Sequence, residues 1–233
     1  MRKSDHILFT ALSLILCVTV FEISNIDFYL QDLLYNFDTS QWLIDKNASL
    51  PKLIFYDSAK RLIIFCFVIA VIAAFFFRHT LLVQQYRKGI LVVLLSVILI
   101  PSTVGLLKAT TNVPCPVDLE HYGGTYPDVT LFSSYPDDFI QKENIRCYPA
   151  GHASGGFALL SLVFLFKSRR NKTIAALSAI TIGGAMGVYK MLIGDHFLSH
   201  TIITVLLSWL IILSVESIVS TFCSEPDNPS VRR

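Results

Sequence analysis

Six long blocks of apolar residues constrain the fold of this chain, and they lie at about 7–24, 62–77, 90–107, 152–166, 173–193 and 197–222. Each block is near the roughly 17–25 residues that cross a hydrocarbon core as a helix. Charged residues make up only 15% of the chain, whereas a soluble domain carries roughly a quarter. The sequence therefore predicts an all-α membrane protein, a bundle of six transmembrane helices that forms one domain over residues 1–233.

The basic residues predict the orientation of this bundle. Eleven of the 19 Lys and Arg residues fall in segments 1–6, 78–89, 167–172 and 223–233, which a six-span chain places on one side of the membrane. Because basic loops stay in the cytoplasm, we expect both termini to be cytoplasmic. The first block has no small-residue cleavage site before Asn25, so we expect it to remain as an anchor. The net charge of +2 argues against a nucleic acid partner.

Two outer segments are too long to be simple turns. Residues 25–61 include IDFYLQDLLYNF, so they are either an amphipathic piece in the headgroup layer or a surface loop with aromatic belt residues. Residues 109–151 are rich in Pro, Gly, Tyr and Asp, and we expect them to form an irregular extracytoplasmic cap. The C-terminal tail, residues 223–233, is expected to be flexible.

Ionisable residues gather at the extracytoplasmic ends of the predicted spans. They are Lys108 after the third span, Arg146 and His152 before the fourth, and Lys190, His196 and His200 around the junction of the fifth and sixth. A single residue of this kind at a helix end is usually a snorkelling or belt residue. Because four helix ends that are distant in sequence contribute to the set, the set as a whole predicts a functional site.

Local spacing adds chemical detail to this site. In CYPAGHASGG, Gly151 and His152 stand where a helix begins, and backbone N–H groups there have no helical partners. Such a helix start attracts anions, phosphate above all. In YKMLIGDHFLSHT, His196 and His200 are four residues apart and share one face if that stretch is helical.

At these positions the chain resembles the type 2 phosphatidic acid phosphatase superfamily, whose membrane branch has six helices. That family has three motifs: Lys followed seven residues later by Arg-Pro, then Pro-Ser-Gly-His, and then Ser-Arg with His six residues and Asp ten residues after the Arg. The corresponding segments here are 108–116, 147–156 and 189–200. Their order, their spacing and their positions at helix ends all match.

The resemblance implies a two-step hydrolysis of a lipid phosphate without metal or cofactor, at the periplasmic face of a bacterial inner membrane. His196 matches the nucleophile that forms a phosphohistidine, and His152 matches the general acid that protonates the leaving alcohol. Lys108, Lys190 and the Gly151 amide match the groups that hold the phosphate. The short aromatic segment after the first span and the sequence SGGFALL are most similar to bacterial enzymes that dephosphorylate lipid A.

Four positions depart from the family pattern. Cys115 and Lys190 replace Arg, Ala150 replaces Ser, and His200 replaces the Asp that orients the nucleophile. Lysine supplies charge but not the planar, bidentate fork of a guanidinium group.

Nearby residues offer substitutes for the lost groups. We expect Arg146, six residues before His152, to supply the charge that Cys115 lacks. His200 can accept a hydrogen bond from the nucleophile only when it is neutral, so Asp195 is a second candidate for supporting the His196 ring.

The five cysteines fall into two groups. Cys17, Cys66 and Cys223 lie in or near spans, where free thiols behave as small apolar residues. Cys115 and Cys147 each stand beside a motif on the extracytoplasmic side. An oxidising compartment permits a disulfide between them, and two free thiols are the alternative.

Other chemistries remain open at this stage. His196 and His200 have the spacing of zinc ligands, with Asp195 and His152 as additional candidates, but Phe197 stands where a zinc protease helix carries Glu. A lipid carrier could use the same cations to bind a phosphate headgroup without turnover. Lipid A, undecaprenyl pyrophosphate and phosphatidylglycerol phosphate are all candidate substrates, and transfer to another lipid is an alternative to hydrolysis.

Overall fold

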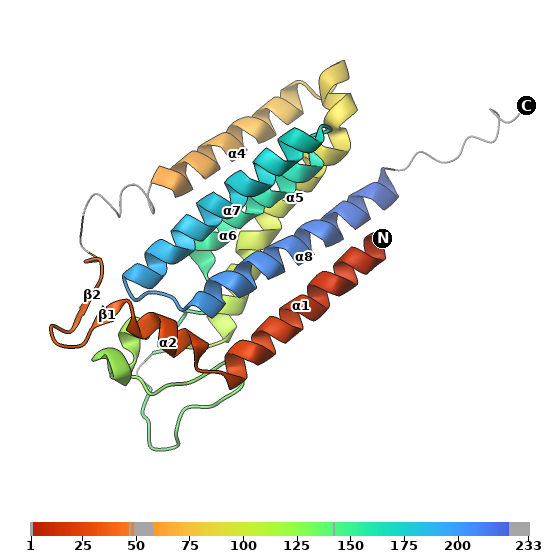
Figure 1. The fold of residues 1–233 in the computed structure, drawn as a ribbon. Coiled ribbons are helices and arrows are strands. Elements are labelled where there is room, and N and C mark those ends of the chain that lie inside the picture. Colours follow the sequence, from red (N-terminus) through yellow and green to blue (C-terminus); the bar gives the residue numbers. More distant parts are fainter. Residues whose placement is uncertain (1, 47, 49–57, 142, 224–233) are drawn as a thin grey trace, which may run out of the picture.

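The computed structural model describes residues 2–46, 48, 58–141 and 143–223, which form a helical bundle with one small hairpin (Figure 1). Its long helices are α1 (Lys3–Ile23), α4 (Ala59–Phe76), α5 (Leu81–Thr110), α7 (Arg169–Leu192) and α8 (Leu198–Phe222). A shorter helix, α6 (Gly151–Ala158), continues as the 3-10 helix η4 (Leu159–Phe164) and packs against α5, α7 and α8. The predicted all-α fold is confirmed.

Four helices in the described part of the chain, α1, α5, α7 and α8, are long and apolar enough to cross a membrane. Two further apolar stretches, Arg61–Phe76 and Gly151–Phe164, are shorter. They coincide with the second and fourth predicted spans. The chain is therefore a multi-pass membrane protein, and the count of six spans stays a prediction.

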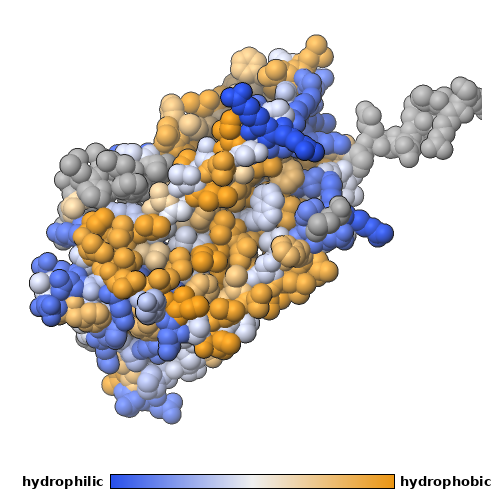
Figure 2. Space-filling view, viewed as in Figure 1, coloured by the Kyte–Doolittle hydropathy of each residue, from blue (hydrophilic) through white to orange (hydrophobic). Residues whose placement is uncertain are grey.

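The outer faces of the bundle carry large apolar side chains. On α1 and α4, for example, the exposed residues are Leu8, Phe9, Leu12, Ile15, Leu16, Leu62, Phe65, Ile69 and Phe76. Figure 2 shows this apolar surface along the middle of the bundle, with hydrophilic residues toward its ends. Soluble monomers rarely expose apolar surface of this extent, so these faces are suited to contact lipid.

Two helix starts differ from the sequence prediction. Residues 78–89 were expected to be a loop, but α5 begins at Leu81, so Arg87 and Lys88 lie within the helix. The Thr80 side chain accepts a hydrogen bond from the Val83 N–H and caps this start. In the same way, Ser168 caps α7, which begins at Arg169 inside the predicted loop 167–172. Hydropathy identifies the apolar part of a helix, whereas its capping residues determine where it begins.

The predicted span 152–166 is an α-helix followed by a 3-10 helix. Its first half packs closely against α7, because a Cβ atom added at Gly156 would lie only 2.6 Å from the Gly183 Cα. Ala153, Phe157 and Ala158 on α6 form a buried core with Ile100 of α5. The small residues after the second motif therefore bring the backbones of α6 and α7 together.

At one end of the bundle lie α2 (Ile26–Asp32), the antiparallel strands β1 (Tyr35–Asn36) and β2 (Gln41–Trp42), and the cap segment (Figure 1). The cap contains the 3-10 helices η2 (Pro116–Asp118) and η3 (Glu120–Tyr122). An aromatic cluster of Phe28, Tyr35, Trp42, Tyr122 and Phe197 joins these segments.

This packing shows where the first part of the segment 25–61 lies, which the sequence left open. Its elements α2, β1 and β2, within residues 26–42, pack on the cap and on the start of α8. Residues 47 and 49–57 lie outside the described part of the chain, as does the predicted flexible tail from residue 224 onward.

Candidate active site

Residues of all three motifs meet at the end of the bundle that carries the cap. Lys108 lies in the last turn of α5, Lys190 lies in the last turn of α7, and Gly151 and His152 begin α6. His196 lies in the short connection between α7 and α8, close to the start of α8. Its ring centroid is 6.3 Å from that of His152.

The turn after α7 determines where Asp195 and His196 lie. Gly194 has a φ of +75°, its N–H donates to the Met191 carbonyl, and the Asp195 N–H donates to the Lys190 carbonyl. These two bonds form a Schellman motif, in which glycine supplies the left-handed residue that ends a helix. The motif folds Asp195 and His196 back over Lys190. The glycine between the lysine and the histidine was the sequence signal for this turn.

His196 and His200 face each other through their Nδ1 atoms, which are 3.2 Å apart. His200 lies in the first turn of α8, and its ring meets the Tyr148 ring edge to face at 5.0 Å. A hydrogen bond between two ring nitrogens requires that one carries the proton and the other the lone pair. His200 therefore occupies the position from which a partner orients the His196 ring.

His196 is buried, with 2% of its surface exposed. Burial lowers its pKa well below the usual value for histidine, and electrostatic interactions with His200, Lys108, His152 and Lys190 lower it further. The ring is therefore neutral at physiological pH. A neutral imidazole has a lone pair on one nitrogen, which a nucleophile requires.

The start of α6 is fixed by the start of α8. The Ala150 N–H donates to the Thr204 hydroxyl at 2.9 Å and approaches the His200 carbonyl at 3.3 Å. A Cβ atom added at Gly151 would lie 3.7 Å from Lys108 Cδ and 4.0 Å from its Nζ. The Lys108 ammonium thus lies beside the N-terminus of α6, and together they make an electropositive region suited to an anion.

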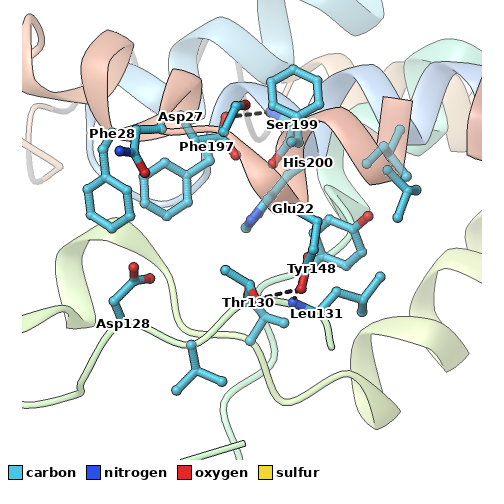
Figure 3. Close-up of a pocket in the computed structure, with 17 residues that line it drawn as sticks. Glu22, Asp27, Phe28, Asp128, Thr130, Leu131, Tyr148, Phe197, Ser199 and His200 are labelled. Atoms are coloured by element: carbon cyan, nitrogen blue, oxygen red, sulfur yellow. Dashed lines mark hydrogen bonds between the residues drawn. The ribbon is translucent and has the colours of Figure 1, made fainter. Parts of the chain in front are cut away.

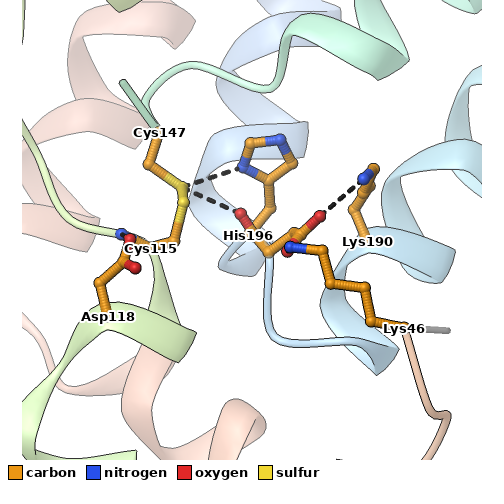
Figure 4. A network of polar contacts seen from close by, with 7 residues as sticks. Lys46, Cys115, Asp118, Cys147, Lys190 and His196 are labelled. Atoms are coloured by element: carbon orange, nitrogen blue, oxygen red, sulfur yellow. Dashed lines mark hydrogen bonds and ion pairs between the residues drawn. A yellow bond between two sulfur atoms is a disulfide. The ribbon is translucent and has the colours of Figure 1, made fainter. Parts of the chain in front are cut away.

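Asp195 is held by two lysines (Figure 4). One carboxylate oxygen is 2.6 Å from the buried Lys190 Nζ, and the other is 2.7 Å from Lys46 Nζ. Burial raises the pKa of Asp195, but the hydrogen bonds and charges of the two lysines outweigh it and hold the pKa below its usual value. Asp195 is thus a charged partner of Lys190, and its carboxylate does not contact the His196 ring in the described contacts.

Lys46 was missed in the sequence. It comes from the segment after β2, which is joined to the end of α7 by a hydrogen bond from the Ile44 N–H to the Leu192 carbonyl. Nothing in the spacing of Lys46 relative to the motifs signals this contact, because it depends on how two distant loops pack.

A disulfide bond joins Cys115 of the first motif to Cys147 of the second (Figure 4). The Cys147 sulfur lies 3.4 Å from His196 Nδ1 and 2.9 Å from the Asp195 carbonyl oxygen. Cys115 follows α5 and Cys147 precedes α6, so the bond fixes both segments against the connection that carries His196. Cys17, Cys66 and Cys223 are free cysteines.

Arg146 is not brought into this cluster. Its side chain is exposed, and the structure gives it no hydrogen bond or ion pair with any described residue. The next residue, Cys147, is fully buried in the disulfide. The guanidinium therefore lies toward the surface, one residue away from the site.

Two cavities flank the histidines. One has a volume of about 550 Å³, is mostly apolar, and opens beside His152 between α4, α5, α6 and α7. The other is about 100 Å³ and lies on the other side of His200, where Figure 3 shows Glu22, Asp27, Asp128 and Tyr148 around it. The Glu22 carboxylate accepts hydrogen bonds from the Thr130 hydroxyl and from two backbone N–H groups of the cap. The cavity of about 550 Å³ beside His152 has the size of a ligand site.

Comparison with known proteins gives two matches. The family described as the PAP2 superfamily matches residues 89–222, a range that contains all three motifs. The lipid A 4'-phosphatase of Francisella tularensis subsp. novicida (strain U112) is 28% identical over 122 residues, which cover 51% of this chain and 52% of that protein. The chain thus matches about half the length of that relative. No solved structure matches this chain.

Proposed function

The chain belongs to the PAP2 superfamily, and from this premise we propose that it hydrolyses a lipid phosphate monoester or pyrophosphate through a phosphohistidine. The observation that carries the proposal is the contact between His196 and His200. If His196 Nδ1 donates to His200 Nδ1, the lone pair of His196 is on Nε2, which remains available for attack on phosphorus.

The first step binds the phosphate. The ammonium of Lys108 and the N–H groups at the start of α6 neutralise its oxygens, and Lys190 adds a third positive group. Lys190 is already paired with Asp195, so the carboxylate holds the ammonium in place before substrate arrives. Lysine binds phosphate as a point charge, so Lys190 supplies the positive charge of the family's Arg without its bidentate geometry.

The second step transfers the phosphoryl group. His196 Nε2 forms a bond to phosphorus while the bond from phosphorus to the lipid oxygen breaks, and His152 donates a proton to that oxygen. Water then attacks the phosphohistidine, His152 accepts a proton from it, and inorganic phosphate leaves. His200, through its Nδ1, keeps the proton of His196 on Nδ1 in both halves of the reaction.

The apolar cavity supports a lipid as the substrate. It reaches from His152 along Ile64 and Phe67 of α4, a shorter apolar helix, and along Ile98 of α5, a helix long enough to span the membrane. A headgroup at His152 would have its acyl portion in this apolar space. A soluble phosphate ester would gain nothing from these walls.

Lipid A is the substrate that we test first, because the curated relative is a lipid A 4'-phosphatase. Undecaprenyl pyrophosphate and phosphatidylglycerol phosphate are the next candidates. We place the site on the periplasmic side of the inner membrane, because the basic segments 78–89 and 167–172 lie at the opposite end of the bundle from the cap.

The test measures phosphate release by the purified protein from each of these lipids, with and without a chelator. We expect release that is insensitive to chelator and absent in His196→Ala. Release of the same rate from the His196→Ala variant would contradict the nucleophile assignment. A protein that binds these lipids and releases phosphate from none of them would be a lipid-binding protein instead, and recovery of a phosphorylated second lipid would identify a transferase.

A further inference from the structure

The disulfide lies directly beside the two histidines that we place at the centre of the reaction. The sulfur of Cys147, and not that of Cys115, is the one in contact with His196 Nδ1 (Figure 4). All three side chains, Cys147, His196 and His200, are buried. In the oxidised protein this sulfur is bonded to Cys115 and cannot act as a thiolate ligand.

The three potential ligand atoms have the spacing of a zinc site. Zinc binds thiolate sulfur at about 2.3 Å and imidazole nitrogen at about 2.0–2.1 Å in a tetrahedron, so neighbouring ligand atoms lie about 3.3–3.7 Å apart. The distance from Cys147 Sγ to His196 Nδ1 is 3.4 Å, and that from His196 Nδ1 to His200 Nδ1 is 3.2 Å. One ligand atom from each of the three side chains lies within 4.8 Å of the others.

We propose that reduction of the Cys115–Cys147 disulfide creates a site for Zn²⁺ formed by Cys147, His196 and His200. A dithiol supplies two electrons and two protons, the S–S bond breaks into two thiols, and the dithiol becomes a disulfide. Zn²⁺ then displaces the proton of the Cys147 thiol, because thiolate is the form that binds the metal. Three protein ligands leave a fourth position for water or a phosphate oxygen.

Occupation of this site blocks the proposed reaction for a stated chemical reason. Zn²⁺ on His196 Nδ1 takes the lone pair of that nitrogen, so a neutral ring carries its proton on Nε2. The atom that must attack phosphorus then has no lone pair. Zn²⁺ also takes the Nδ1 lone pair of His200, which otherwise orients His196. The inhibition rests on the proposed function, whereas the zinc binding does not.

The surrounding charges are compatible with such a site. The Cys147 thiolate brings one negative charge, and Asp195 already offsets the charge of Lys190. Lys108 is a nearby positive group that weakens the binding of a cation. We therefore expect a site that zinc occupies and a strong chelator empties.

Two matched variants distinguish zinc binding at this site from the general effects of losing the disulfide. Cys115→Ser and Cys147→Ser both break the bond, but only Cys115→Ser leaves a thiol in contact with His196. Both are made in a chain in which Cys17, Cys66 and Cys223 are changed to Ala, so that no other thiol binds metal. Zinc bound after gel filtration is measured without any substrate.

We expect about one Zn²⁺ per chain in Cys115→Ser and none in Cys147→Ser. Cobalt added to Cys115→Ser should show the absorption of a thiolate ligand, and phosphate release by this variant should rise at least tenfold when a chelator removes zinc. Equal zinc in the two variants, or none in Cys115→Ser, would overturn the proposal. If neither variant folds, the wild type is reduced with a dithiol and desalted without oxygen. Failure of the reduced wild type to bind zinc would then overturn the proposal.

Discussion

The Nδ1 atoms of His196 and His200 lie 3.2 Å apart, and this contact explains how a histidine can stand where the family has an aspartate. In both side chains the contacting atom is bonded to Cγ, so Nδ1 of histidine corresponds to Oδ1 of aspartate. A neutral histidine offers a lone pair at that point but no negative charge. In the proposed mechanism, where His200 is the acceptor, the substitution keeps a lone pair at the position of the aspartate oxygen and removes the negative charge.

Changes at His200 should follow this correspondence. We expect His200→Asp and His200→Asn to keep phosphate release within about tenfold of wild type, because each retains an acceptor at the same point. His200→Ala should lose about 10²-fold or more, since the proton of His196 is then no longer held on Nδ1. Initial rates at saturating lipid measure this, and an Ala variant as active as the Asn variant would count against the orienting role.

Gly194 should tolerate no side chain. A residue other than glycine is strained at a φ of +75°, and a Cβ atom there would lie 2.3 Å from Trp42. We expect Gly194→Ala to destabilise the protein by about 2 kcal/mol or more and to lower activity, because the turn places Asp195 and His196.

Gly184 provides the matched control for this change. It lies within α7, the helix that Gly194 follows, and a Cβ atom added there meets nothing within 4 Å. Gly184→Ala should leave activity unchanged and alter stability by no more than about 1 kcal/mol, in the stabilising direction. Thermal unfolding in detergent compares the two, and equal losses would mean that the turn geometry is not the cause.

The two lysines on Asp195 should differ in importance. Lys190 is buried, with 7% of its side chain exposed, whereas the Lys46 side chain is 60% exposed. Asp195→Asn leaves the Lys190 ammonium buried without its counter-charge and should cost about 3 kcal/mol of stability. Lys46→Ala removes an exposed lysine and leaves Asp195 paired with Lys190, so it should cost less than about 1 kcal/mol. Chemical unfolding curves of the two variants test this order.

Arg146 and Lys108 should also differ. Lys108 lies beside the start of α6, so Lys108→Ala should reduce phosphate release by about 10²-fold or more. Arg146 is exposed, and we expect Arg146→Ala to retain most of the wild-type rate. An equal decrease of phosphate release in the two variants would show that Arg146 contacts the phosphate during turnover. Arg146 would then take the role of the family arginine at the position of Cys115.

The small cavity behind His200 should make stability depend on pH. Partial desolvation raises the pKa of Asp128 although the residue is exposed, the charge of His121 lowers this pKa, and nearby Glu22 raises it. When the pKa of a carboxyl is higher in the folded protein than in the unfolded one, protonation favours the folded state. This stabilisation is present below the unfolded-state pKa of about 4 and is lost as the pH rises through the folded-state pKa. Asp128→Asn should therefore raise the melting temperature at pH 7 and leave it unchanged at a pH below 4.

The sequence was sufficient for the helices and for the three motifs, because apolar length and motif spacing are local properties. The spacing between Lys190 and His196, for example, is read directly from the chain, whereas the turn at Gly194 that folds His196 back over Lys190 was not predicted. The contact between Lys46 and Asp195 could not be predicted from the sequence. It joins two loops whose packing depends on the aromatic cluster of Tyr35, Trp42 and Tyr122.

The expectation for Arg146 shows the same limit in another form. Six residues separate it from His152, which is close enough in sequence for a shared site. Its neighbour Cys147 is buried in the bond to Cys115, whereas Arg146 itself is exposed. The direction of a side chain in an irregular segment depends on such tertiary links, which spacing does not contain.

The connection that carries His196 is fastened at both ends by side chains of α2, a helix outside the region shared with the family. Gln31 donates to the Met191 carbonyl near the end of α7, and Asp27 accepts from the Ser199 N–H at the beginning of α8. Substitutions in residues 1–33 are therefore expected to shift the position of His196, and with it the rate of the proposed reaction, while every motif stays intact. Exchanging this N-terminal portion between relatives would also exchange the two α2 side chains that hold the connection carrying His196.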